Sequence, residues 1–204
     1  MHKIKKRFFY HGAPCTIESF DYKFTNQGND QYGSGFYFTP CKTTATSYCI
    51  PNGVVQANGI PYTPTLHKVR LNLENPLDSQ HIQPLTLAQC IEIITRAPDY
   101  EEVLGDYYDL GRERLDVIIR KHAKLYSAND ETPLLNTLNL LANDHYGDNI
   151  RELNTVLKDV LGYDGVVDTV GRTMIAVAWF PEQIEFVQRI KNPKKELEEE
   201  GPTP

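Results

Sequence analysis

Hydrophobic and polar residues alternate in several short segments, which is the pattern of half-buried β-strands. The clearest case is His67–Leu73, in which every second residue is polar. Lys5–Tyr10 ends in three aromatic residues and predicts a first strand that delivers His11 at its end. The remaining predicted strands are aromatic or rich in β-branched residues, and they are Phe36–Phe38, Tyr163–Val170, Thr173–Phe180 and Ile184–Ile190.

Residues 84–161 follow a different period, with apolar residues three and four positions apart as on one face of a helix. Asp99 and Asp148 each precede a glutamate by three or four residues, which favours a helix start. Gly162 is placed to end the last helix. The segment therefore predicts about four helices, in the groups Leu87–Ile94, Leu115–His122, Leu134–Leu141 and Ile150–Val160.

The connecting segments give weaker predictions. Ile17–Phe20 is expected to form a short helical turn. Asp21–Tyr32 is polar and predicts a mobile loop, which either closes over a ligand or is an inert surface loop. Pro51–Pro64 predicts a loop or a small hairpin. Residues 1–191 are expected to form one domain, and residues 192–204 a disordered acidic tail.

Composition narrows the class of protein. The chain has 204 residues, of which 40% are hydrophobic and 24% charged, as in ordinary globular domains. The net charge of −6 gives no global basic field for nucleic acid. The four cysteines lack paired spacing, so no zinc motif is present and reduced thiols in the cytoplasm are expected. Neither a secretory signal nor a membrane span is evident, so we expect a cytoplasmic location, in the producing cell or a target cell.

The stretch from Gly33 to Cys49 is the strongest candidate for chemistry. Gly33 and Gly35 allow the backbone to approach a ligand closely. An aromatic strand follows, and Lys42–Cys49 then predicts a short helix that returns Tyr48 beside Tyr37. Two such rings make either a slot for a flat aromatic ligand or an ordinary part of the core.

This stretch resembles the NAD-binding segment of the poly(ADP-ribose) polymerase superfamily. It is equally similar to the small ADP-ribosyltransferase domains of bacterial and phage polyvalent proteins. The resemblance rests on Gly-x-Gly-Phe-Tyr-Phe followed by Tyr-Cys eleven residues after the first tyrosine. Four other segments match the family in order, and they are Tyr10-His11-Gly12, residues 69–77 ending in Asn-Pro-Leu, residues 165–169 and residues 179–184.

The resemblance implies an α+β fold with a split, mostly antiparallel β-sheet. Because the family connects these strands briefly, residues 84–161 are expected to be a helical insertion. The resemblance also implies NAD as co-substrate, without a metal. Tyr37 and Tyr48 would flank the nicotinamide ring, the Gly12 backbone would hold its carboxamide, and His11 would bond a ribose hydroxyl. Without a ligand, His11 would simply be a buried, hydrogen-bonded histidine.

The third catalytic position departs from the family pattern. The family usually has a glutamate there, and counting on from Asp168 without gaps places Ile175 at that position. An aliphatic residue at this point marks family members that transfer a single ADP-ribose or are inactive. A carboxylate of the target, or Asp168 itself, could substitute. The alternative Arg-Ser-Glu class needs an arginine where His11 stands, so we set it aside.

The sequence therefore predicts a mono-ADP-ribosyltransferase that acts on a macromolecular acceptor, a protein rather than nucleic acid. The resemblance implies a bacterial or phage effector or toxin. Two alternatives stay open. One is an inactive module that binds NAD or another protein, and the other is an NAD glycohydrolase in which water is the acceptor.

Overall fold

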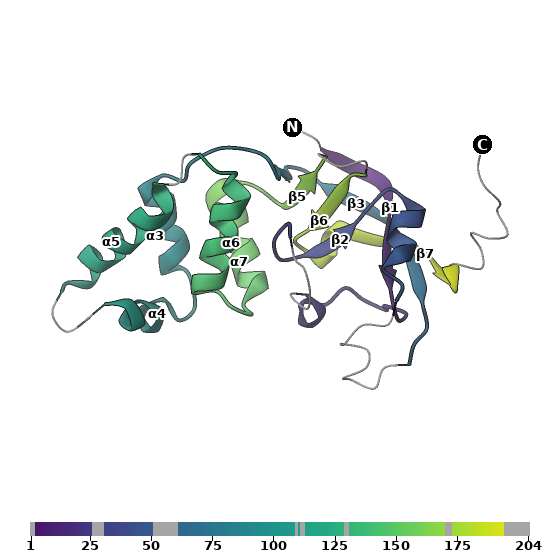
Figure 1. Cartoon of the computed structure of the whole chain (residues 1–204), viewed down its shortest axis with the longest axis horizontal. Helices are drawn as coiled ribbons and strands as arrows, with labels where there is room; N and C mark the ends of the chain where they lie inside the picture. Colours follow the sequence, from purple (N-terminus) through teal and green to yellow (C-terminus); the bar gives the residue numbers. More distant parts are fainter. Residues whose placement is uncertain are drawn as a thin grey trace.

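A computed structural model describes residues 3–25, 31–50, 61–108, 110, 113–128, 131–169 and 173–193. The fold is α+β, as predicted. Strands gather at one end of the long axis and helices at the other (Figure 1). The strands come from the beginning and the end of the chain, whereas the larger helices come from its middle.

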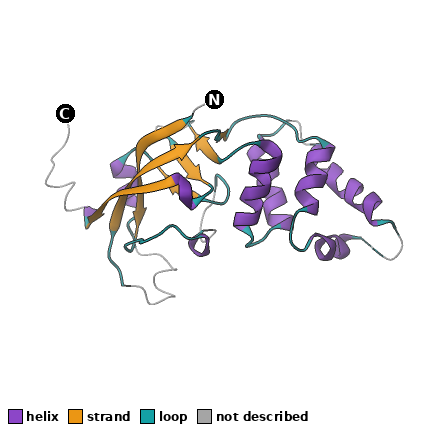
Figure 2. Cartoon of the chain, turned by 180° about the vertical axis from the view of Figure 1, so that it is seen from behind, coloured by secondary structure: helices purple, strands orange, loops and turns teal. Residues whose placement is uncertain are grey.

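The strands form two sheets, drawn in orange in Figure 2. The three-stranded sheet is antiparallel, in the order β1 (Ile4–Ala13), β3 (Thr65–Leu73) and β7 (Ile184–Lys191). The four-stranded sheet has the order β2 (Phe36–Phe38), β6 (Ile175–Ala178), β5 (Gly165–Asp168) and β4 (Leu77–Asp78). Its β4–β5 pair is parallel and the other two pairs are antiparallel. The split, mostly antiparallel sheet is therefore confirmed.

Two hydrophobic cores follow from the alternation of side chains in the four-stranded sheet. One face carries Phe36 and Phe38, which pack with Phe9 and Val69 of the three-stranded sheet, so the first core lies between the sheets. The opposite face carries Val177, which packs with residues of the helices in the second core. The four-stranded sheet is therefore covered on both faces.

The expected insertion contains five helices within the described residues. They are α3 (Leu87–Thr95), α4 (Tyr100–Tyr107), α5 (Leu115–Ser127), α6 (Leu134–His145) and α7 (Ile150–Leu161). The helix after Asp99 is separate from its neighbours, so the expected number was one too low. Helices α6 and α7 lie beside the sheet, and α4 and α5 lie farther away (Figure 1). As predicted, Gly162 ends α7, with a left-handed φ of 79°.

The return from the helices to the sheet depends on one buried carboxylate. Asp164 accepts hydrogen bonds from the backbone N–H groups of Glu74 and Asn75, at 2.7 and 2.9 Å. The Asn75 side-chain amide in turn donates to the Gly162 carbonyl oxygen at 2.7 Å. These contacts fasten the turn between β3 and β4 to the start of β5, which places Asp168 at the end of that strand.

Two local predictions were wrong. Strand β1 continues to Ala13, so His11 lies within it rather than at its end. Residues 17–20 are not helical, and a 3₁₀ turn, η1 (Tyr22–Phe24), follows them instead. The reason is tertiary: the Phe20 ring packs against Phe36, Phe38 and Phe186, with ring centroids 5.1–5.4 Å away. The predictions for residues 26–30, 51–60 and 194–204 fall outside the described residues.

Candidate active site

The two sheets are joined where β1 meets the end of β2. Tyr10 and Thr39 exchange backbone hydrogen bonds of 2.8 and 3.0 Å, in an isolated antiparallel bridge. The next rung of such a ladder would pair Gly12 with Tyr37. It does not form, because the Tyr37 carbonyl oxygen accepts a hydrogen bond from the His11 side chain instead, at 2.8 Å. The split in the sheet therefore begins at His11.

His11 is a neutral histidine with a defined tautomer. A carbonyl oxygen can only accept, so His11 Nδ1 carries the proton that it donates to Tyr37. Burial lowers the pKa of His11, and this outweighs the opposing effect of that hydrogen bond. The second ring nitrogen, Nε2, therefore carries a lone pair and can accept a hydrogen bond from a hydroxyl group. The Phe20 ring meets the imidazole edge-on, 5.4 Å between centroids, and limits its rotation.

A second histidine holds the segment around His11. His67 is fully buried on β3, directly opposite His11 in the strand register. Its Nε2 accepts a hydrogen bond from the Ile17 N–H at 2.9 Å, and its Nδ1 lies 3.3 Å from the His11 carbonyl oxygen. Burial, followed by the proximity of His11, lowers the pKa of His67 to about 4. The neutral ring thus ties the loop that follows β1 to the strand beside it.

Gly12 is in contact with helix α1 (Lys42–Ser47), which packs on β1. A Cβ atom at Gly12 would lie 1.8 Å from the Ala45 carbonyl oxygen, so no larger residue fits here without moving the helix. Alternation along β1 turns the Gly12 N–H and C=O groups toward the same edge as those of Tyr10. These two backbone groups therefore point toward the split, one a donor and one an acceptor, as required to hold a carboxamide.

Tyr37 organises the turn before its own strand. Its hydroxyl donates to the Gly33 carbonyl oxygen at 2.7 Å and accepts from the Tyr32 N–H at 3.1 Å. The rings of Tyr32 and Tyr37 lie side by side, with centroids 6.5 Å apart and planes tilted by 44°. The structure thus places a ring beside Tyr37 that sequence reasoning assigned to a surface loop.

Tyr48 follows α1 as its C-terminal cap, and 61% of its surface is exposed. Burial, the charge of Asp168 and the proximity of Tyr48 all raise the pKa of Tyr32, in that order. An exposed ring at the end of this helix is a suitable edge for a planar ligand. Whether Tyr37 and Tyr48 enclose such a ligand stays a prediction.

Asp168 is a buried carboxylate on the same face of the sheet as Tyr37. It accepts hydrogen bonds from the Tyr32 hydroxyl at 3.2 Å and from the buried Ser79 hydroxyl at 2.5 Å. In the register of β5 and β6 it stands directly opposite Ile175. Tyr37 pairs with Val177, two residues along β6 from Ile175. Alternation therefore directs the side chains of Asp168, Ile175 and Tyr37 to one face. Ile175 is half-buried there and packs against the second core.

The glycines of this segment also have a packing role. A Cβ at Gly35 would lie 2.6 Å from Val177 Cγ1 and 2.7 Å from the Ala178 carbonyl oxygen. The small residue at Gly35 is therefore needed for the close pairing of β2 with β6. The approach of a ligand to this backbone stays a prediction.

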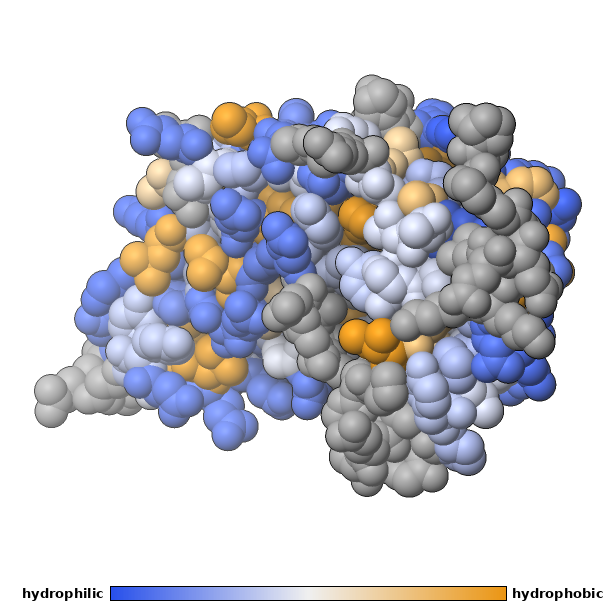
Figure 3. Space-filling view, turned by 45° about the vertical axis from the view of Figure 1, so that its right-hand side comes forward, coloured by the Kyte–Doolittle hydropathy of each residue, from blue (hydrophilic) through white to orange (hydrophobic). Residues whose placement is uncertain are grey.

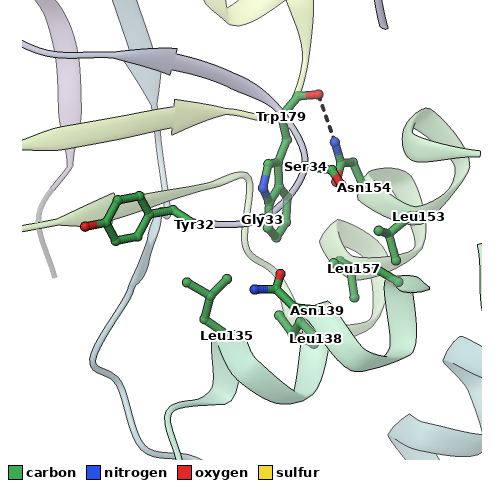
Figure 4. Close-up of a pocket in the computed structure, with 11 residues that line it drawn as sticks. Tyr32, Gly33, Ser34, Leu135, Leu138, Asn139, Leu153, Asn154, Leu157 and Trp179 are labelled. Carbon is green, nitrogen blue, oxygen red and sulfur yellow. Dashed lines mark hydrogen bonds between the residues drawn. The ribbon is translucent and has the colours of Figure 1, made fainter. Parts of the chain in front are cut away.

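A recess lies where the turn before β2 meets the helices (Figure 4). Gly33 faces Asn139 of α6, and Asn154 of α7 donates a hydrogen bond to the Trp179 carbonyl oxygen at 3.2 Å. The recess holds about 20 Å³, the space of roughly one water molecule. It is therefore a joint between the helices and the turn rather than the site of a nucleotide.

Comparison with known protein families decides the family. The family model described as ADP-ribosyltransferase in polyvalent proteins matches residues 5–192. The chain belongs to this family. No curated protein and no solved structure matches the chain. The match confirms the resemblance seen in the motifs, and it supports a transferase that uses NAD as a substrate, as the family does.

Three residues of the candidate site were missed by sequence reasoning. Tyr32, Ser79 and His67 contact the expected residues but belong to none of the matching motifs. Tyr32 adjoins the Gly33 motif, which was the available signal. The contacts of Ser79 and His67 depend on strand pairing and could not be read from spacing.

In the described parts of the chain, no helix has the length and apolar character needed to cross a membrane.

Proposed function

We propose that the domain is a mono-ADP-ribosyltransferase that breaks the bond between nicotinamide and ribose in NAD. The observation that supports this most is the interrupted ladder between β1 and β2. A backbone donor and acceptor at Gly12 and a lone pair on His11 Nε2 lie there, beside the strand that carries Tyr37. These are the groups required to hold a carboxamide, a hydroxyl and a planar ring.

Each of these residues has a separate role in the proposal. The Gly12 backbone orients the nicotinamide carboxamide, and the rings of Tyr37 and Tyr48 keep the nicotinamide flat. Nε2 of His11 accepts a hydrogen bond from a ribose hydroxyl and so fixes the sugar. Positioning of this kind contributes strongly when the leaving group is already cationic, as nicotinamide is.

The balance of the reaction is simple. Nicotinamide leaves with the electron pair of its bond to ribose, and the acceptor forms the new bond to the same ribose carbon. The proton of the acceptor passes to solvent. The group that the site must supply is negative charge near the ribose, where positive charge develops.

Asp168 is our candidate for that charge. It stands opposite Ile175, on the face that carries Tyr37, and the Tyr32 hydroxyl caps one of its oxygens. Rotation of the Tyr32 side chain would uncover that oxygen without moving the backbone. We therefore propose that Asp168 of β5 takes the role of the carboxylate that is missing at Ile175 of β6.

The acceptor and the setting of the reaction are also part of the proposal. Ile175 at the third position favours transfer of a single ADP-ribose over chain elongation. A macromolecular acceptor, a protein rather than nucleic acid, fits the acidic net charge of −6. An effector or toxin acting in the cytoplasm agrees with the polyvalent-protein family to which the chain belongs.

The test is incubation of the protein with labelled NAD and a cell lysate. We expect label in a protein band, and loss of that label in a His11→Ala variant whose circular dichroism remains folded. His81→Ala is the matched control, because His81 is exposed and its side chain bonds only Gln83 among the described residues. Free ADP-ribose without labelled protein would identify a glycohydrolase. Unchanged NAD, or transfer retained by folded His11→Ala, would contradict the proposal.

A further inference from the structure

The helical insertion contains a buried cluster that plays no part in the proposed reaction. His122 and Tyr126 lie one turn apart on α5, and Asp144 and His145 end α6. His122, Tyr126 and His145 are 2%, 5% and 4% exposed. Three of their polar atoms meet at one point: His122 Nε2, His145 Nε2 and the Tyr126 hydroxyl oxygen.

The three atoms form a nearly equilateral triangle. The two Nε2 atoms are 3.1 Å apart, and the Tyr126 oxygen lies 3.4 Å from His122 Nε2 and 3.3 Å from His145 Nε2. A point equidistant from three atoms at such separations lies about 1.9 Å from each, close to the bond lengths of zinc to imidazole nitrogen and to oxygen. The two imidazole planes are nearly perpendicular, with centroids 5.0 Å apart, so they meet through their Nε2 corners and do not stack.

Hydrogen bonds can satisfy the contacts among these three atoms only in part. Tyr126 donates its single proton to Asp144 at 2.7 Å, so its oxygen can only accept from the histidines. If one Nε2 is protonated, one of the three contacts is left between two lone pairs. If both are protonated, both can donate to the phenol oxygen, and the two nitrogens then face each other at 3.1 Å without a hydrogen bond. His145 Nδ1 is also buried without a hydrogen-bond partner. A cation at the centre would satisfy all three converging atoms at once.

We propose that the insertion binds one divalent cation of the zinc class through His122, His145 and Tyr126. Asp144, whose carboxylate lies 2.7 Å from the Tyr126 oxygen, is the neighbouring negative charge of the site. Two neutral imidazoles, a phenolate and a carboxylate balance the double positive charge, as a buried ion requires. Binding releases the phenol proton to solvent. No group of three His, Cys, Asp or Glu residues in the described chain could hold a metal, so the phenol is essential as third ligand.

Sequence reasoning gave no zinc motif, because the two histidines are 23 residues apart on separate helices. Only the folded arrangement of α5 and the end of α6 brings them together. A cation there would link α5 to the C-terminal end of α6. It would therefore stabilise the insertion, independently of the chemistry at the split.

The test is titration of the full chain with zinc chloride after treatment with a chelator. We expect one bound equivalent, a higher melting temperature, and the near-ultraviolet absorbance change of a tyrosine that becomes phenolate. Tyr126→Phe keeps both histidines and the packing, and it should lose the absorbance change and at least tenfold in affinity. His145→Gln should lose binding, whereas His81→Gln, at an exposed histidine, should bind as the wild type does.

Several outcomes would overturn the site. They are no binding at micromolar zinc, equal binding by wild type and Tyr126→Phe, and a loss of binding in His81→Gln. If His145→Gln does not fold, the comparison of wild type with Tyr126→Phe still decides. A wild type that is stable, metal-free and unaffected by zinc would mean that the cluster is only a hydrogen-bonded core.

Discussion

Single residues define the site more through their surroundings than through their identity. His11 is neutral because it is buried, and its tautomer is set by one carbonyl oxygen of Tyr37. Asp168 matters because strand register places it opposite Ile175, which we predicted from the motifs to stand at the position of the family's acid. At this scale the open question is which strand supplies the carboxylate.

Exchanging the two residues answers that question. We expect Asp168→Asn to reduce transfer strongly, because charge stabilisation by one preorganised group is worth about 3 kcal/mol. Ile175→Glu alone should destabilise the fold by about 1 kcal/mol, because two carboxylates would then face each other across a strand pair. The double variant Asp168→Asn/Ile175→Glu should recover both stability and NAD turnover, measured by thermal melts and nicotinamide release.

The control is Asp168→Asn with Ile175→Gln, which has the same shape without the charge. Recovery by this uncharged pair, or full activity of folded Asp168→Asn, would show that Asp168 supplies only structure. A melting temperature that collapses in Ile175→Glu would show that residue 175 belongs to the core.

The sequence proposed candidate residues for the site but not the contacts among them. His11, Gly12 and Tyr37 were found from motifs, because the family fixes them at recognisable spacings. Tyr32 escaped because a polar loop around it suggested a mobile surface segment. Its backbone N–H donates to the Tyr37 hydroxyl, and its own hydroxyl donates to Asp168, a long-range contact that leaves no local pattern.

At the scale of elements, helix α1 and strand β1 depend on each other. Gly12 allows the helix to approach so closely that the Ala45 carbonyl oxygen lies where a side chain would begin. The helix in turn ends at Tyr48, which caps its C-terminus. The His-Gly pair therefore has a packing reason in addition to its proposed role in binding.

Gly12→Ala tests this dependence. The added methyl group must displace α1, and we expect a loss of about 3 kcal/mol in the free energy of unfolding. Gly105→Ala is the matched control, because its Cβ would lie 3.6 Å from Leu110 Cδ1 in ordinary contact. Inside helix α4 that change should stabilise by about 0.5–1 kcal/mol.

Urea titration of both variants provides the measurement. Equal stabilities for Gly12→Ala and the wild type would mean that α1 moves without cost, and the packing reason would then be wrong. If Gly12→Ala is as stable as the wild type but does not bind NAD, the role of Gly12 is ligand binding through its backbone and not packing.

Elements were predictable where the period of apolar residues was long. The helices α5, α6 and α7 each carry several turns of the pattern, and they form at the expected places. Residues 17–20 were too short for a reliable period. There the burial of Phe20 and the bond from the Ile17 N–H to His67 decided an extended path instead.

At the scale of the whole molecule, the four-stranded sheet is the shared layer between the second sheet and the helices. On the face shown in Figure 3, hydrophobic residues appear as separate patches within a mostly hydrophilic surface. Much of the apolar surface is instead used in the two cores. His67 is buried on β3, between β1 and β7, and its protonation state depends on pH.

Acid should therefore destabilise the fold. The pKa of His67 is about 4 in the folded protein, against 6.5 when it is unperturbed. Between these values the unfolded chain binds the proton and the folded one does not, so stability falls as pH decreases. The slope is about 1.4 kcal/mol for each pH unit. His11 adds to the loss because its pKa is also lowered, and Arg189 also disfavours the charged form of His67.

The measurement is the free energy of unfolding by urea between pH 7 and pH 4.5. His67→Gln should reduce the slope by about 1.4 kcal/mol for each pH unit, the contribution of one proton, whatever the stability of the variant at pH 7. His81→Gln should leave the slope unchanged. An identical slope in wild type and His67→Gln would mean that other groups cause the acid sensitivity.

The isolated bridge between Tyr10 and Thr39 has a mechanical consequence. The two sheets are hydrogen-bonded to each other at that pair, and the next pair, Gly12 with Tyr37, is missing. A carboxamide bound to the Gly12 backbone would supply hydrogen bonds there from outside the chain. Nucleotide binding would then strengthen the junction between the two sheets, and release of nicotinamide would weaken it again.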